Sequence, residues 1–109
     1  MNKLDTIKLY RGATSEVEFD FTSFTFVENS KCVFMMKPLY NDEIIKEIEF
    51  TESKLYIETF TDEFTATLGD DKYRYDIMYM INEERYPQCL PSEIEVSEVV
   101  NEYTENQDN

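Results

Sequence analysis

The chain has 109 residues, of which 41% are hydrophobic and 15% aromatic, and this suffices for one domain with a single core. It contains 24 acidic and 10 basic residues, which gives a formal net charge of −14 at pH 7. Because such a chain is repelled by nucleic acids and by anionic membranes, the charge disfavours both as ligands. A basic partner, divalent cations or solubility remain as explanations of the charge.

The first predicted strand covers residues 5–10, with Ile7 and Leu9 facing inward. The turn that follows, residues 11–14, contains Gly12, which is free to adopt a positive φ. A short strand and a tight turn therefore open the domain.

Two further strands are predicted before the middle of the chain. Residues 15–21 alternate apolar and acidic side chains, which is typical of a half-buried strand. Residues 31–37 are apolar on both faces and end at Pro38, which is typical of a central strand covered on both sides. Phe24 lies between them and extends the aromatic pattern.

Residues 43–50 and 54–60 are expected to pair as a β-hairpin with its bend at Glu52 and Ser53. Apolar residues alternate on both arms and are expected to face the core. These inward residues are Ile48, Phe50, Leu55 and Ile57.

Residues 61–68 break the strand periodicity and predict one helical turn capped by Thr61, with acidic residues in the first turn. The stretch 68–81 then predicts a long strand. One of its faces carries Tyr73, Tyr75, Ile77, Tyr79 and Ile81. The other face carries Arg74, Asp76, Met78 and Met80.

The C-terminal part is predicted to contain two more strands. A loop over residues 82–85 leads to a strand at 86–90, which Pro87 confines to an edge or a bulge. Residues 92–100 alternate again, and residues 101–109 have little to bury. We therefore expect one domain over residues 1–100 and a flexible acidic tail over 101–109.

The spacing of these elements predicts an all-β fold, a single antiparallel β-sandwich of about seven or eight strands with one short helical turn. A small barrel is the alternative. In immunoglobulin-like sandwiches a tyrosine near the start of such a long strand bonds back to the preceding connection, and Tyr73 or Tyr75 is placed for this role.

Catalytic and metal-binding motifs are missing from the sequence. Histidine is absent, which excludes Ser-His-Asp and Cys-His catalysis and most zinc chemistry. Two glycines are too few for a phosphate-binding loop. Carboxylates at Asp70, Asp71 and Asp76, or at Asp42 and Glu43, offer oxygens to calcium, but a turn role for these residues is favoured. We expect no enzyme, no metal and no cofactor.

The two cysteines, Cys32 and Cys89, are too few for a disulfide framework and are expected to be reduced thiols, although a bridge between neighbouring strands stays open. The N-terminal segment has no apolar region or cleavage site of a signal peptide, and no apolar run approaches membrane-spanning length. These features predict a soluble protein that is made in the cytoplasm.

Two rows of carboxylates are the candidate protein-binding residues. Glu16, Glu18 and Asp20 alternate along one predicted strand, and a second row follows near the C-terminus. The second row consists of Glu93 and Glu95, with Glu98 nearby. On neighbouring strands, two such rows would imitate the phosphate track of DNA. The alternative is a solvated face that blunts edge pairing and keeps the protein soluble.

The motifs IKLYRGAT, EVEFDF, KCVFMMKP, FTATLGDDKYRYDIMY and PSEIEVSEVV follow one another in the chain. Their order resembles short immunoglobulin-like proteins of tailed phages and prophages of Gram-positive bacteria, and the RGAT turn and YRYDI are the most specific parts. The resemblance implies an immunoglobulin-like fold, attachment to other virion proteins and no catalytic residue.

We therefore expect a phage-encoded, non-enzymatic interaction module of the virion, located in the tail, the baseplate or the head surface. The alternative is an acidic inhibitor in the host cytoplasm that imitates DNA, such as an anti-CRISPR protein that blocks the nucleic-acid-binding cleft of a nuclease. A host-encoded adaptor domain is a third hypothesis.

Overall fold

The computed structural model describes residues 2–3, 5–69, 72–87 and 89–98, which form ten strands and one short helix. In chain order these are β1 (Asn2–Lys3), β2 (Ile7–Arg11), β3 (Ser15–Asp20), β4 (Ser30–Pro38), β5 (Lys46–Phe50), β6 (Leu55–Phe60), α1 (Asp62–Ala66), β7 (Lys72–Ile81), β8 (Glu84–Pro87), β9 (Cys89–Leu90) and β10 (Ser92–Glu98). The prediction of an all-β chain with one short helical turn is confirmed.

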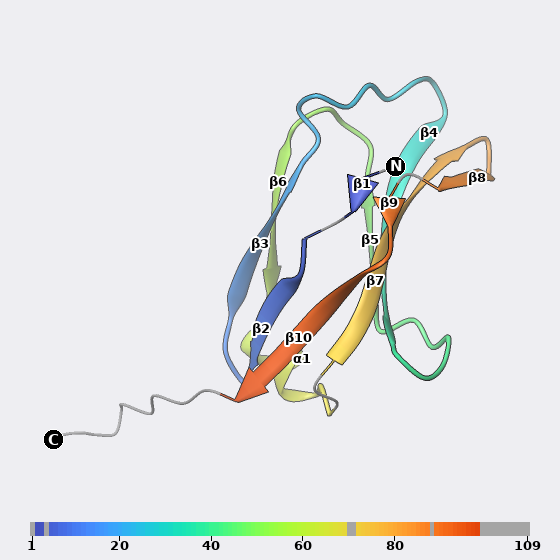
Figure 1. Cartoon of the computed structure of the whole chain (residues 1–109). Coiled ribbons are helices and arrows are strands. Elements are labelled where there is room, and N and C mark those ends of the chain that lie inside the picture. Colours follow the sequence, from blue (N-terminus) through green and yellow to red (C-terminus); the bar gives the residue numbers. More distant parts are fainter. Residues whose placement is uncertain (1, 4, 70–71, 88, 99–109) are drawn as a thin grey trace, which may run out of the picture.

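The strands form two layers (Figure 1). The larger sheet has the order β2-β10-β7-β4-β5, with β8 paired to β7, and the smaller sheet contains β3 and β6. Aromatic side chains join the layers, since the Phe19 ring of β3 lies 5.3 Å from Phe34 of β4 and 5.0 Å from Phe50 of β5. The core is therefore a layer of aromatic rings in edge-to-face and tilted contact between the two sheets.

The expected purely antiparallel arrangement is wrong at the edge of the larger sheet. Strand β2 pairs in parallel with β10, with Ile7 opposite Ile94, and the two-residue strands β1 and β9 also pair in parallel. Gly12, at a φ of 81°, turns the chain from β2 into β3, as predicted. The two strands then separate, because β2 joins the larger sheet and β3 joins the smaller one.

Strand β4 is an interior strand of the larger sheet, paired with β7 on one side and β5 on the other, as its two apolar faces predict. Cys32, Phe34 and Met36 face the core and have no exposed surface. Val33, on the opposite face, is only 2% exposed. Lys31, Met35 and Lys37 on that same face are half-buried, so the predicted covering of β4 on both sides is complete on the core face and partial on the outer face.

The predicted hairpin of β5 and β6 is wrong. Strand β5 pairs with β4, and β6 pairs with β3, so residues 51–54 cross from one sheet to the other. The prediction of which side chains of β6 face the core is also wrong. Leu55 and Ile57 are 43% and 54% exposed, whereas Phe60 is fully buried. Both alternations of this strand contain apolar residues, and the one with the larger aromatic rings buries more area.

Helix α1 covers one end of the core. Thr61 caps it by accepting a hydrogen bond from the Phe64 amide at 3.1 Å, as predicted. Thr65 is fully buried, and its hydroxyl oxygen accepts a hydrogen bond from the Gly12 amide at 3.0 Å and donates to the Ala13 carbonyl at 2.9 Å. The helix is thereby fastened to the turn between β2 and β3.

Strand β7 buries Tyr73, Tyr75 and Ile77, as its alternation predicts. The hydroxyl of Tyr75 donates a hydrogen bond to the carbonyl of Asp5, in the segment before β2. The prediction is a bond from this tyrosine to the connection before β7, whereas the bond to Asp5 reaches the segment before β2. The residue instead ties the N-terminal segment to the centre of the larger sheet.

After β7 the chain turns at Asn82 and Glu83, which adopt φ values of 49° and 71°. The predicted strand over 86–90 is divided into β8 and β9. In the described part of the chain β8 pairs along one side only, with β7, as expected for a strand that contains Pro87. The predicted tail over 101–109 and the end of the strand over 92–100 lie outside the described residues.

Candidate protein-interaction surface

The first predicted row of carboxylates lies on the outer face of the smaller sheet. Glu16, Glu18 and Asp20 are exposed, and they alternate along β3 with Val17 and Phe19, which pack on the core. Residues two apart on one face of a strand are about 6.6–6.8 Å apart. The row therefore holds three carboxylates at regular spacing on a rigid element.

The neighbouring strand β6 places apolar side chains beside this row. Ile57 is opposite Glu18 and Leu55 is opposite Asp20 in the register of the two strands. In the part of the chain that the structure describes, the carboxylates of Glu16 and Glu18 make no hydrogen bond or ion pair. We call these five residues the acidic–apolar face.

Asp20 is fixed in position at the end of the row. Its carboxylate accepts hydrogen bonds from the hydroxyl of Thr22 at 2.7 Å and from the backbone amide of Thr22 at 2.9 Å. These bonds, the hydroxyl bond first, lower the pKa of Asp20 below its usual value. The charge at this end therefore persists to lower pH than that of an ordinary aspartate.

The second predicted row has a different environment. Glu98 pairs with Arg11 of β2, and Glu93 lies 3.9 Å from Lys72 of β7. Glu95 is in register with Lys8 on one side and with Lys72 on the other. Glu93 and Glu95 therefore lie on one face of β10 beside lysines, whereas Glu98 alternates to the other face, where it meets Arg11, so the three carboxylates do not form one row.

The two rows do not lie on neighbouring strands, because β3 belongs to the smaller sheet and β10 to the larger one. A double track of charge, as predicted for imitation of DNA, is therefore not formed by these six residues. Sequence alone could not separate the two rows, because it does not state which strand joins which sheet.

The other candidates from the sequence do not converge on a site. Asp42 forms an ion pair with Arg74 at 2.8 Å, and Asp70 and Asp71 lie outside the described residues. Across residues 2–3, 5–69, 72–87 and 89–98, no group of three or more Cys, Asp or Glu is placed to hold a metal ion. Cys32 is fully buried, and the side chain of Cys89 is outside the described part of the chain.

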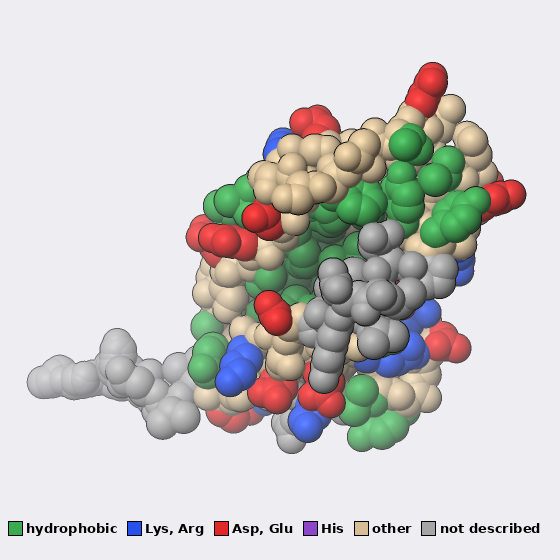
Figure 2. Space-filling view, turned by 45° about the horizontal axis from the view of Figure 1, so that its top comes forward, with side chains coloured by type: hydrophobic (Ala, Val, Ile, Leu, Met, Phe, Trp, Pro, Cys, Tyr) green, Lys and Arg blue, Asp and Glu red, His purple; other side chains and the backbone are tan. Residues whose placement is uncertain are grey.

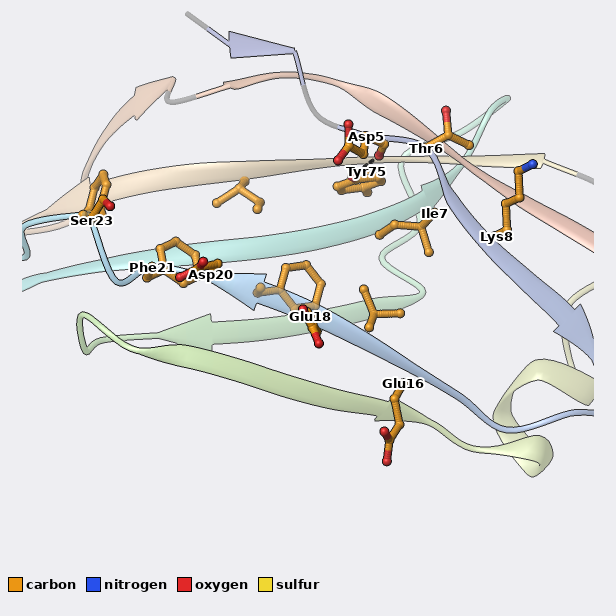
Figure 3. Close-up of a pocket in the computed structure, with 14 residues that line it drawn as sticks. Asp5, Thr6, Ile7, Lys8, Glu16, Glu18, Asp20, Phe21, Ser23 and Tyr75 are labelled. Atoms are coloured by element: carbon orange, nitrogen blue, oxygen red, sulfur yellow. Dashed lines mark hydrogen bonds between the residues drawn. The ribbon is translucent and has the colours of Figure 1, made fainter.

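A hollow that the sequence did not indicate lies between β2 and β3. Its volume is about 640 Å³, and its lining runs from Asp5 to Lys8 on one side and from Glu16 to Phe21 on the other. Figure 2 shows the hollow floored by hydrophobic side chains, with acidic side chains at its margin. The close-up in Figure 3 shows Asp5, Ile7 and Tyr75 on one side and Glu18 and Phe21 on the other.

The loop between β4 and β5 forms a second feature that sequence reasoning missed. Tyr40 is 83% exposed, and the nearby Leu39 and Ile44 are also exposed. Large apolar side chains exposed in a loop are typical of contact with other molecules. The sequence signal that could have indicated this feature is the presence of such residues in a predicted turn.

Comparison with protein-family models, curated proteins and solved structures finds no match to this chain. Among the described residues, the helix is too short and too polar to cross a bilayer.

Proposed function

We propose that the protein is a non-enzymatic interaction module with an immunoglobulin-like sandwich fold, carried by a phage particle. The strand order supports the fold, because β3–β6 and β10-β7-β4 correspond to the B–E and G-F-C pairings of immunoglobulin domains. The phage particle is implied by the sequence resemblance. In a particle that carries many copies of the protein, the weak contacts of the single copies would add up.

The acidic–apolar face carries this proposal. Leu55 and Ile57 expose apolar surface on a rigid sheet, and Glu16 and Glu18 beside them have carboxylates without an intramolecular partner in the described residues. Interfaces combine an apolar centre with charged groups at the rim, and this face has both parts in adjacent strands. A face that serves only to keep the protein soluble would need the carboxylates but not the exposed apolar side chains.

The test is incorporation of the protein into purified phage particles. Mass spectrometry should detect the wild-type protein in particles, and the double variant Leu55→Ser/Ile57→Ser should be depleted from them. Val27→Ser is the control for loss of exposed apolar surface, because Val27 is 49% exposed and lies in the loop between β3 and β4 and not on β3 or β6. Absence of the wild-type protein from particles would contradict a virion role.

Imitation of DNA is the second candidate function. The net charge of −14 and the row Glu16, Glu18 and Asp20 favour it. A single row at about 6.6–6.8 Å spacing is sparser than duplex DNA, which carries one charge per about 1.7 Å. The exposed Leu55 and Ile57 on the neighbouring strand β6 favour the interaction module instead.

Salt dependence distinguishes the two candidates. A DNA-imitating inhibitor should compete with duplex DNA for a nuclease, and this competition should weaken steeply as ionic strength rises. The triple variant Glu16→Ser/Glu18→Ser/Asp20→Ser should abolish it. Competition that survives both high salt and the triple variant would contradict imitation of DNA.

A further inference from the structure

Strands β2 and β3 enclose a wedge that no other strand of the described chain fills. They meet at the Gly12 turn and diverge, because β2 pairs with β10 and β3 pairs with β6 (Figure 1). Within the described residues each of the two strands is paired along one side only, so each presents an unpaired edge to the wedge. On the opposite side of the sandwich, the Lys46 ammonium of β5 lies 5.4 Å and 5.1 Å from the ring centres of Phe60 and Phe64.

The backbone groups at the β3 edge follow from its pairing with β6. The Phe21 amide donates to the Lys54 carbonyl at 3.0 Å, and this antiparallel register makes Phe19 and Val17 the next hydrogen-bonded positions. Glu16, Glu18 and Asp20 alternate with these positions and direct their N–H and C=O groups away from β6. The free edge of β3 is therefore formed by the backbone of Glu16, Glu18 and Asp20.

The interior of the wedge is apolar. Its volume is about 640 Å³, and the side chains that form its floor come from β2, β3, β7 and the loop after β3. They are Ile7, Phe19, Phe21, Phe24, Tyr75 and Ile77. An inserted strand would bury every second side chain against this floor and leave the others in solvent.

The rim of the wedge is acidic. Asp5, Glu16, Glu18 and Asp20 line it, with Lys8 as the only cation among the described lining residues. A second copy of the chain would place its own acidic β3 edge against this rim, and the chain's residues 101–109 contain three acidic and no basic residues. Both occupants meet like charge, so a basic segment is the complementary one.

We propose that this wedge accepts an extended segment of a partner protein in which apolar residues alternate with lysine or arginine. The inserted strand would pair with the edges of β2 and β3, which run in opposite directions, and would join the two sheets on this side. This mode is β-strand addition, in which backbone hydrogen bonds give affinity and alternate side chains give specificity. The inference rests on the proposed interaction function and names the class of partner.

The test uses a fluorescent peptide of about seven residues in which valine and lysine alternate, slightly longer than β3. Fluorescence anisotropy should show binding to the wild-type protein. A peptide with glutamate in place of lysine, and a peptide of the same composition with its valines and lysines in two blocks, should not bind. A peptide N-methylated at alternate residues loses the donors that strand pairing requires and should also fail.

Glu18→Pro and Glu18→Gln separate the backbone edge from the charge. Proline removes the N–H that faces the wedge and leaves the bonds to β6 in place, a position at which edge strands tolerate proline. We expect about tenfold weaker peptide binding for Glu18→Pro, and a change within about threefold for Glu18→Gln. Circular dichroism of both variants checks that the fold is kept, and the N-methylated peptide decides the question if Glu18→Pro unfolds.

Equal binding of the N-methylated and unmodified peptides would overturn the inference, as would equal binding by the two Glu18 variants. If the wild-type protein is a dimer in solution and Glu18→Pro makes it monomeric, the occupant of the wedge is instead a second copy of the chain. The proposed function fails separately, because it depends on the protein's presence in particles and on Leu55 and Ile57. A particle-bound protein that does not bind the basic peptide refutes the wedge alone.

Discussion

Thr65 shows how one polar side chain is accommodated in an apolar core. It has no exposed surface, and its hydroxyl donates to the Ala13 carbonyl at 2.9 Å, with the Asp62 carbonyl as a second acceptor at 3.2 Å, while its oxygen accepts from the Gly12 amide at 3.0 Å. Two backbone groups of the β2–β3 turn are thus satisfied by one residue of α1. A hydrophobic residue of the same shape would leave both without these bonds.

We expect Thr65→Val to lower the free energy of unfolding by about 1–3 kcal/mol, because it leaves part-buried donor and acceptor groups unsatisfied. Chemical denaturation measures this difference. Thr67→Val is the matched control, since the Thr67 hydroxyl donates to the Phe64 carbonyl at an exposed site where water can replace it. Equal effects of the two substitutions would contradict the role assigned to Thr65.

Asp20 provides a pH-dependent prediction. Because hydrogen bonds from Thr22 lower its pKa, Asp20 contributes stability that is present above the pKa of the unfolded chain and is lost as pH falls through the lower pKa of the folded state. Thr22→Val removes the hydroxyl donor and should raise the pKa of Asp20 toward its usual value. An NMR titration of the side-chain carboxyl carbon measures the pKa. Thr25→Val, two residues after the turn, should leave it unchanged.

At the scale of the element, the turn between β2 and β3 depends on one glycine. Gly12 has a φ of 81°, and a Cβ atom added there would meet no atom within 4 Å. A substitution is therefore opposed by backbone conformation alone and not by crowding.

We expect Gly12→Ala to lower the free energy of unfolding by about 1–2 kcal/mol, the difference that a left-handed conformation imposes on an L-residue. Gly69→Ala is the control, because Gly69 also has open space around its Cα but no left-handed φ. It should be neutral or stabilising by a few tenths of a kcal/mol, up to about 1 kcal/mol. Thermal unfolding of both variants gives the comparison, and a stable Gly12→Ala protein would show that the turn does not need glycine.

Most individual elements were predictable from sequence because their signals are local. The alternation of β3 and β7, the two apolar faces of β4 and the cap at Thr61 each lie within a few consecutive residues. Local periodicity also placed Glu16, Glu18 and Asp20 together on one exposed face. Such features need no knowledge of the rest of the chain.

The errors concern which strand pairs with which. The bend at Glu52 and Ser53 is compatible with a hairpin and with a crossing between sheets, and only packing of Tyr56 and Phe60 on the core selects the crossing. The inward face of β6 is ambiguous in the same way, because both alternations of this strand contain apolar residues, and the sequence predicts Leu55 and Ile57 as the inward ones. The wedge was missed because it exists only when β2 leaves β3 to pair with β10, a choice made by contacts far apart in the sequence.

At the scale of the whole molecule, the excess of acidic groups is larger than its ion pairs can compensate. Arg11, Lys31, Lys72 and Arg74 each pair with a carboxylate, but 24 acidic residues face 10 basic ones. The folded state brings these charges closer together than the unfolded chain does, so their mutual repulsion opposes folding.

We expect the melting temperature to rise when sodium chloride is increased from about 10 mM to about 150 mM, because salt screens this repulsion. Calorimetry at constant pH near 7 measures the change. The same increase at about pH 4, where much of the carboxylate charge is neutralised, should have a smaller effect. A melting temperature that falls with salt would show that attractive ion pairs outweigh the repulsion.

The parallel pairing of β2 with β10 has a consequence for biosynthesis. Arg11 and Glu98, which meet at the far end of this pairing, are 87 positions apart. A ribosome therefore produces the β2 strand long before the strand beside which it belongs, and the entropy of closing so large a loop is met only after β10 has been made. The earliest strand of the sheet to be made is the last to be seated, so a chain released prematurely, without β10, would leave Ile7 and Leu9 uncovered and prone to aggregate.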